Sequence, residues 1–281
     1  MLTTSKKILL DAQAGGYGVG AFNIENMEMA QAAIAAAEAT RSPILLQTTP
    51  STLKYASCAL FAAQVRALAE TASVPVALHL DHGSSFHLAV EAFHSGYTSI
   101  MIDGSKLPFE ENIDLTTRVV AVCHSAGVPV EAELGMVGGK EDSLDNGDVD
   151  IYTDPQQAAE FAERTGVDFL AIAIGTAHGI YKGEPRLDLD RLSQIREKVS
   201  IPLVLHGTSG VPDDVVRECI RRGICKINYA TDLRIAYTEG VRKVLEDPSV
   251  YDPKKYGAAG RKAVQAYVED RIRNCGSAGK A

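Results

Sequence analysis

Three histidines stand at or just after the ends of short β-rich runs: His82, His178 and His206. A single histidine in such a place is as often a hydrogen-bonded core residue as a metal ligand. Three histidines from three different strands, converging on one rim, are typical of a catalytic zinc with an open coordination position. The spacing therefore favours a metal site. The other run ends carry polar residues that would complete this rim: Asn23, Asp81, Asp103, Glu133 and Asn228.

Two segments of small and hydroxyl-bearing residues follow the last two β-rich runs. The motif Gly207-Thr-Ser-Gly210 follows the seventh run, and Asn228-Tyr-Ala-Thr231 follows the eighth and opens a helical pattern. Neighbouring loops of this kind bind phosphate in barrel enzymes, because backbone N–H groups and a helix N-terminus face the anion. Lys182 and Arg234 lie just beyond run ends and are candidate cations for such a ligand.

The elements that must position these residues alternate along the chain. Amphipathic helical patterns separate the β-rich runs, for example at residues 26–40 and 154–165, where Asn26 and Asp154 are residue types that cap helices. Such alternation predicts parallel strands, and eight units in one chain predict a closed (β/α)₈ TIM barrel of α/β class. The eight predicted strands are residues 19–23, 43–47, 74–80, 99–102, 129–133, 169–174, 202–205 and 224–228.

We expect a single domain over residues 1–281, with an irregular functional insertion at 135–152 and a C-terminal helical tail at 258–273. Apolar residues make up 46% of the chain, charged residues 23%, and the net charge is −8. The lack of a Lys/Arg run argues against nucleic acid and membrane as partners. No signal segment or membrane-length apolar run is evident, and the five cysteines form no CxxC pair. These features indicate a cytoplasmic protein with reduced thiols.

Seven segments of the chain resemble the motifs of class II fructose/tagatose-bisphosphate aldolases, which are zinc-dependent. The resemblance covers nearly the whole chain, and its motifs fall at the predicted strand ends. The segments are Ala21-Phe-Asn23, His79-Leu-Asp-His-Gly-Ser-Ser85, Met101-Ile-Asp-Gly-Ser105, Val130-Glu-Ala-Glu-Leu-Gly135, Gly175-Thr-Ala-His-Gly179, Leu203-Val-Leu-His-Gly207 and Lys226-Ile-Asn228.

The resemblance implies reversible cleavage of a ketose 1,6-bisphosphate to dihydroxyacetone phosphate and glyceraldehyde 3-phosphate through a zinc-stabilised enediolate. His82, His178 and His206 would hold Zn²⁺, with Glu133 and Asp103 as alternative or neighbouring metal carboxylates. A monovalent cation, Na⁺ or K⁺, often accompanies the phosphate in this family. The expected partners are a small sugar phosphate, further copies of the chain in a homodimer or homotetramer, and an accessory non-catalytic subunit.

The resemblance also assigns catalytic and substrate-binding roles. Asp81 would be the acid and base at the C4 hydroxyl, and Glu141, in the loop after the fifth strand, would exchange a proton at C3. The residues expected to bind substrate are Asn23, Gly179, Lys182, Gly207, Thr208, Ser209, Asn228, Tyr229, Ala230, Thr231 and Arg234.

Several departures from the family pattern surround the expected substrate. Gly83 stands where tagatose-type members often carry a second histidine, and Thr208 replaces a common alanine. The segment Gln47-Thr-Thr-Pro-Ser-Thr52 differs from the usual Gly-Thr-Pro-Gly-Thr. Ala230 resembles the tagatose type, because fructose-type members carry Asp or Asn there. We therefore expect tagatose bisphosphate to be favoured over fructose bisphosphate.

Three other functions compete with this interpretation. Another phosphorylated ketose or keto-acid, such as a deoxy-ketogluconate phosphate, would use the same chemistry. A zinc-dependent barrel hydrolase is disfavoured, because the first strand ends in Ala21-Phe-Asn23 and not in a His-x-His pair. A non-catalytic aldolase partner subunit is disfavoured, because all three histidines are present.

Lys226, in the last strand, suggests a Schiff-base lysine and hence a metal-independent aldolase. Strand parity places Lys226 on the inward face with Asn228 but one layer deeper, and it places Glu131 one layer below Glu133. We predict that Lys226 is structural and pairs with Glu131 or another inward carboxylate, because an unpaired buried ammonium is costly.

Overall fold

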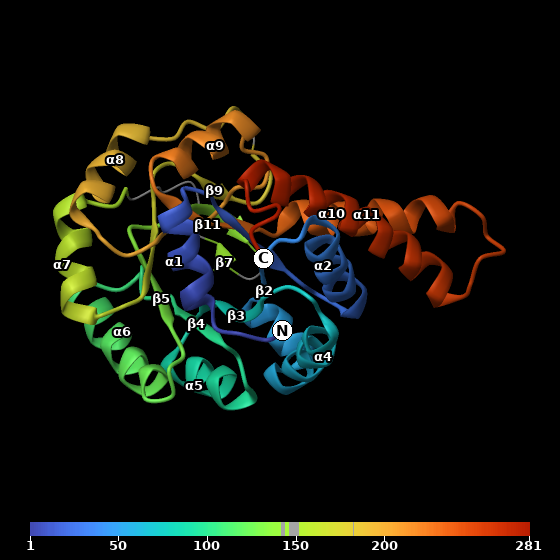
Figure 1. Cartoon of the computed structure of the whole chain (residues 1–281), viewed down its shortest axis with the longest axis horizontal. Coiled ribbons are helices and arrows are strands. Elements are labelled where there is room, and N and C mark those ends of the chain that lie inside the picture. Colours follow the sequence, from blue (N-terminus) through green and yellow to red (C-terminus); the bar gives the residue numbers. More distant parts are fainter. Residues whose placement is uncertain (142–143, 146–151, 182) are drawn as a thin grey trace.

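The computed structural model describes residues 1–141, 144–145, 152–181 and 183–281. Eight parallel strands close into a barrel in the order β1-β11-β10-β8-β5-β4-β3-β2, and helices surround it (Figure 1). This confirms the predicted TIM barrel. None of the helices among the described residues has the length and hydrophobicity that a membrane span requires.

The barrel strands lie close to their predicted positions, with ends shifted by at most three residues. They are β1 (Val19–Asn23), β2 (Ile44–Thr48), β3 (Val76–Gly83), β4 (Ser99–Ile102), β5 (Val130–Leu134), β8 (Phe169–Ile172), β10 (Leu203–Leu205) and β11 (Ile224–Tyr229). The helices are α1 (Ser5–Gly15), α2 (Met27–Thr40), α3 (Pro50–Ala56), α4 (Cys58–Thr71), α5 (Phe86–Ser95), α6 (Phe109–His124), α7 (Pro155–Thr165), α8 (Leu189–Lys198), α9 (Asp213–Arg221), α10 (Thr231–Leu245) and α11 (Pro253–Cys275).

Local sequence explains where the helices begin. The Asn26 side chain accepts a hydrogen bond from the backbone N–H of Met29 at the start of α2. The Asp154 carboxylate accepts from two backbone N–H groups at the start of α7, where Pro155 occupies the first helical position. Both caps satisfy N–H groups that have no partner within the helix, as the sequence predicted.

The barrel interior is divided into an apolar end and a polar end. Apolar side chains from the strands, including Val19, Leu45 and Phe169, form one cluster with Leu9 and Ala12 of α1, which closes that end of the barrel. Buried polar and charged side chains occupy the interior toward the carboxyl ends of the strands. The fold thus directs its polar groups to one mouth of the barrel, where catalytic groups of TIM barrels lie.

Two predictions about irregular segments need correction. The insertion at 135–152 is not wholly irregular, because β6 (Gly138–Glu141) pairs with β7 (Leu144–Asp145) and with β9 (Ala177–His178). The C-terminal helix begins at Pro253 and not at residue 258, because Asp252 caps it and Pro253 suits its first turn. Helices α10 and α11 pack together and project from the side of the barrel (Figure 1).

Candidate metal and phosphate site

A bulge in β3 places two consecutive side chains at the barrel mouth. The pairing of β3 with β4 shifts register between Leu80 and Gly83, and His82 has a positive φ of 48°. A regular strand would point Asp81 and His82 to opposite faces, whereas a bulge re-aims one of them. Gly83 belongs to this bulge, because a Cβ there would lie 2.3 Å from the Met101 carbonyl oxygen. That contact gives a steric reason why this backbone carries glycine and not histidine.

The three histidines predicted as metal ligands meet at this mouth. Each is at least 95% buried, and candidate ligand atoms of all three lie within 4.8 Å of one another. His82 Nε2 is 2.9 Å from His206 Nδ1, and the His178 ring stands edge-on to His82 with the centroids 5.0 Å apart. They come from β3, β9 and the end of β10, so that no single element fixes the cluster.

Carboxylates orient two of these rings. Asp103 Oδ2 lies 2.8 Å from His82 Nδ1, and Glu131 Oε1 lies 3.0 Å from His206 Nε2. An ionised carboxylate can only accept a hydrogen bond, so His82 Nδ1 and His206 Nε2 each carry a proton. His82 Nε2 and His206 Nδ1, which face each other, then share a single proton. A divalent metal would replace that shared proton. Buried histidines with carboxylate partners are the donor set that zinc prefers, so these residues fit a zinc ion.

Electrostatics favour the neutral state of two of the predicted metal ligands. Burial lowers the pKa of His178 well below its ordinary value, and the nearby His82 and His206 lower it further. Burial also lowers the pKa of His206, although Glu131 opposes that shift. A neutral imidazole is the form that binds a metal.

Glu133 and Asp103 occupy different positions around the histidines. Asp103 is tied to His82 and to the backbone N–H and hydroxyl of Ser105, so it orients a ring in this structure. Glu133 Oε1 accepts from the Val137 N–H, but its buried Oε2 has no hydrogen-bond partner among the described residues and lies 3.7 Å from His206 Nδ1. Burial, followed by the charge of Asp103, raises the pKa of Glu133 to about 8. A nearby cation would stabilise this carboxylate, and His82, Asp103 and Glu133 form a second set of clustered donors.

Asp81 is held by a set of side-chain amides. Its Oδ2 accepts from the Nδ2 of Asn23 at 3.0 Å and the Nε2 of Gln47 at 3.1 Å, and its Oδ1 accepts from the Nδ2 of Asn228 at 3.0 Å. Burial raises the pKa of Asp81, but the charges of His82 and its other neighbours outweigh burial and lower the pKa overall. Asp81 is therefore an ionised carboxylate that three amides hold in place. Sequence reasoning noted Gln47 only as a departure from the family pattern and missed this contact, which the pairing of β2 with β3 creates.

The predicted pairing of Lys226 is confirmed. Lys226 is fully buried, and its Nζ lies 3.0 Å from Glu131 Oε2. His79 lies beside this pair, 3.4 Å from the ammonium, and its Nδ1 bonds the Ser99 hydroxyl. Burial, with a further contribution from Lys226, lowers the pKa of His79 to about 3, so His79 is neutral. A chain of contacts thus runs from Lys226 through Glu131 to His206 at the mouth.

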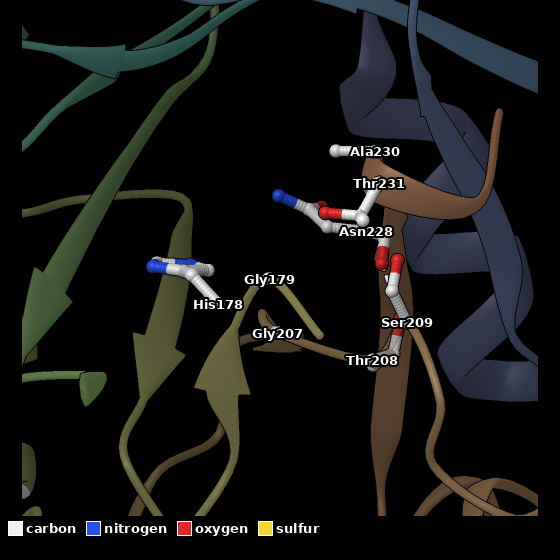
Figure 2. Close-up of a pocket in the computed structure, with 8 residues that line it drawn as sticks. All are labelled: His178, Gly179, Gly207, Thr208, Ser209, Asn228, Ala230 and Thr231. Carbon is white, nitrogen blue, oxygen red and sulfur yellow. Dashed lines mark hydrogen bonds between the residues drawn. The ribbon is translucent and has the colours of Figure 1, made fainter. Parts of the chain in front are cut away.

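A small pocket beside the histidines is built mainly from backbone and hydroxyl groups. Figure 2 shows Gly179 and Gly207 between His178 on one side and Thr208 and Ser209 on the other. Gly207 has a positive φ of 65°, and a Cβ on it would lie 2.7 Å from Ala177 backbone atoms, so two loops approach closely only because it is glycine. The lining residues are His178, Gly179, Gly207, Thr208, Ser209, Asn228, Ala230 and Thr231, where α10 begins.

Four predicted site residues are not brought to the barrel mouth or to this pocket by described side chains. Tyr229 points out of the barrel, stacks on Phe22 and places its hydroxyl 3.5 Å from Cys275 Sγ, because it follows inward-facing Asn228 in the strand. Arg234 pairs with Glu25, with Nη2 2.7 Å from Oε1, so its charge is already engaged on the rim. Lys182 lies outside the described residues, and Glu141 ends β6 with no side chain described.

Comparisons with known proteins point to one family. The family described as "Fructose-bisphosphate aldolase class-II" matches residues 3–280. A fructose-bisphosphate aldolase of Geobacillus stearothermophilus is 46% identical over 284 residues, covering all of this chain and 99% of its own. The crystal structure of the YdjI aldolase from Escherichia coli K12 superimposes with a TM-score of 0.90 at 39% identity, covering both chains fully.

Proposed function

Because this chain belongs to the class II fructose-bisphosphate aldolase family, we propose that it reversibly cleaves a ketose 1,6-bisphosphate to dihydroxyacetone phosphate and glyceraldehyde 3-phosphate. The observation that carries the proposal is the immobilised Asp81 carboxylate beside three clustered histidines. This arrangement joins a base to a metal-binding donor set, next to a pocket suited to phosphate.

Asp81 is the proposed base in the cleavage direction. Its carboxylate takes the proton from the C4 hydroxyl, the C3–C4 bond breaks, and its electron pair moves toward the C2 carbonyl oxygen. In the synthetic direction the same carboxyl group returns the proton to the aldehyde oxygen. The amides of Asn23, Gln47 and Asn228 fix the carboxylate, so no side chain must be ordered as the proton moves.

The proposed ligands of a resident Zn²⁺ are His82, His178 and His206. When bound, such an ion supplies a Lewis acid that stabilises negative charge on substrate oxygens. The chain's own contribution is to hold the rings, through Asp103 and Glu131, and to exclude water by burying them. Glu133, whose buried Oε2 has no hydrogen-bond partner in the described part of the chain, is proposed to support a cation next to His206.

The pocket at Gly179 and Thr208 is the proposed site for the phosphate of dihydroxyacetone phosphate. Among the described residues, the backbone N–H groups of Gly179, Thr208 and Ser209 donate no hydrogen bond within the protein. Unused N–H groups beside the start of α10 form an anion site, and a monovalent cation is proposed to lie near it. Glu141 is proposed to return the proton to C3, which completes dihydroxyacetone phosphate.

For the C4 epimer we propose that tagatose bisphosphate is favoured. A site that hydrogen-bonds a substrate hydroxyl strongly rejects the epimer in which that hydroxyl is inverted. Ala230 lines the pocket and has no side-chain group that could bond such a hydroxyl. Fructose bisphosphate is the second candidate, because the curated relative is named a fructose-bisphosphate aldolase and Gln47 adds a polar group beside Asp81.

The assembly and location stay predictions. A single domain, a homodimer or homotetramer, an accessory subunit and a cytoplasmic setting are expected from the sequence and the family resemblance. All five cysteines are buried and unpaired, which supports a reducing compartment.

A coupled cleavage assay on tagatose and fructose bisphosphates tests the proposal. Asp81→Asn should abolish cleavage of both while zinc content is unchanged. Asp168→Asn, a matched change of a largely buried carboxylate at the start of β8, should keep the activity. Cleavage of neither substrate by the wild-type protein, or full activity in Asp81→Asn, would contradict the proposal.

A further inference from the structure

Tyr181 lies between the two loops that build the proposed phosphate pocket. Its hydroxyl accepts a hydrogen bond from the Ala177 N–H at 2.7 Å and donates one to the Gly207 carbonyl oxygen at 2.7 Å. Ala177 and His178 form β9, which leads into Gly179, whereas Gly207 follows β10. One phenol thus joins segments that lie about 30 residues apart in the chain.

The bond to Gly207 has a directional consequence for the next amide. The described residues contain no cis peptide bond, so the Thr208 N–H is antiparallel to the Gly207 carbonyl within one planar unit. While the carbonyl points to Tyr181, the Thr208 N–H points the opposite way. That N–H donates no hydrogen bond within the described part of the chain, and Thr208 lines the pocket.

Other contacts hold the phenol and the loop in place. The Tyr181 ring is partly buried against the main apolar core, and a Cβ on Gly210 would lie 3.4 Å from it. The Thr208 hydroxyl bonds the Asn228 carbonyl and ties the same loop to β11. The aromatic body is therefore fixed by packing, and the hydroxyl spans the two loops.

We propose that Tyr181 is a positioning residue, whose hydroxyl sets the spacing of the loops at Gly179 and Thr208 and aims their amides at a phosphate group. The proposal rests on the proposed function, which identifies the ligand as a sugar phosphate. Tyr181 does not touch the phosphate; it acts through the backbone it holds. The group that the two loops would bind is a phosphate monoester dianion, and inorganic phosphate is its simplest probe.

Tyr181→Phe removes the hydroxyl and keeps the ring, so it tests the proposal in the full-length zinc-loaded protein. We expect the dissociation constants of inorganic phosphate and dihydroxyacetone phosphate to rise about 10-fold by calorimetry, because two hydrogen bonds that order the loops are lost. KM for the bisphosphate should rise in parallel, with kcat at saturation and zinc content within about twofold of wild type.

The matched control is Tyr97→Phe. Tyr97 is a buried tyrosine whose hydroxyl bonds Thr48, and it does not line the pocket. Loss of the Tyr97 hydroxyl should lower the free energy of unfolding without changing the affinity for phosphate. Equal phosphate affinity in wild type and Tyr181→Phe would overturn the inference. Parallel loss of zinc and phosphate binding in Tyr181→Phe would also overturn it, because the hydroxyl would then act on His178.

Two further outcomes keep the inference separate from the proposed function. A wild-type protein that binds phosphate, loses that affinity in Tyr181→Phe and cleaves no ketose bisphosphate would contradict the proposed function while supporting the role of Tyr181. If Tyr181→Phe does not fold, hydrogen exchange on the wild type decides. Phosphate should slow exchange in segments 175–181 and 203–211 together, and protection of only one segment would overturn the inference.

Discussion

Removing the buried ammonium of Lys226 should destabilise the protein severely. Lys226 and Glu131 are both fully buried and lie 3.0 Å apart, so Lys226→Met leaves a carboxylate without its cation in the barrel interior. Breaking one partner of a buried pair costs about 3–5 kcal/mol. At about 2–4 °C per kcal/mol, the melting temperature should fall by roughly 10 °C.

Urea unfolding of the metal-free protein measures this effect without a contribution from zinc. Glu131→Gln should also destabilise, because it strands the ammonium, and the double variant should lose much less than the sum of the two. We expect a coupling free energy of about 2 kcal/mol or more. The buried-pair explanation would be refuted if the unfolding free energy of each single variant lay within about 1 kcal/mol of wild type and the two effects simply added in the double variant.

Further predictions concern the metal, the catalytic loop, the class of aldolase and acid stability. His82→Ala, His178→Ala and His206→Ala should each lose bound zinc by elemental analysis while circular dichroism shows an intact barrel; retained zinc would argue against the ligand set. Glu141→Ala should slow detritiation of dihydroxyacetone phosphate at C3 far more than it weakens binding, and an unchanged exchange rate would remove Glu141 from the mechanism. Borohydride with dihydroxyacetone phosphate should trap no adduct on Lys226. Burial raises the pKa of Asp168, but bonds from a lysine, a backbone N–H and a histidine lower it overall. Its stabilisation is therefore complete above the unfolded-state pKa of about 3.9 and is lost as the pH falls through the lower folded-state pKa. Asp168→Asn should be less stable than wild type at pH 7 by roughly 1–2 kcal/mol, and the gap should close as the pH approaches 3; a gap independent of pH would contradict this sign.

The barrel could be predicted because its signals are local and repeated. Most strands are short apolar runs that open near a proline or end in a polar residue, and caps such as Asn26 and Asp154 mark helix starts. The inward pairing of Lys226 with Glu131 followed from strand parity, since a residue two positions deeper must face the same interior.

The fine geometry of the site depended on contacts that sequence spacing does not encode. Parity alone would turn His82 away from Asp81, and only the bulge, with its positive φ, brings both to the mouth. Gln47 reaches Asp81 through strand register, which no local pattern reveals. Arg234 was predicted at the substrate phosphate, but its pairing with Glu25 depends on a distant rim carboxylate.

The most direct test of the account is chelator-reversible cleavage by zinc-loaded protein. Protein with one zinc per chain should cleave tagatose and fructose bisphosphates, lose that activity on removal of the metal, and regain it when zinc is restored. Full, chelator-insensitive cleavage by protein that contains no divalent metal would contradict the account.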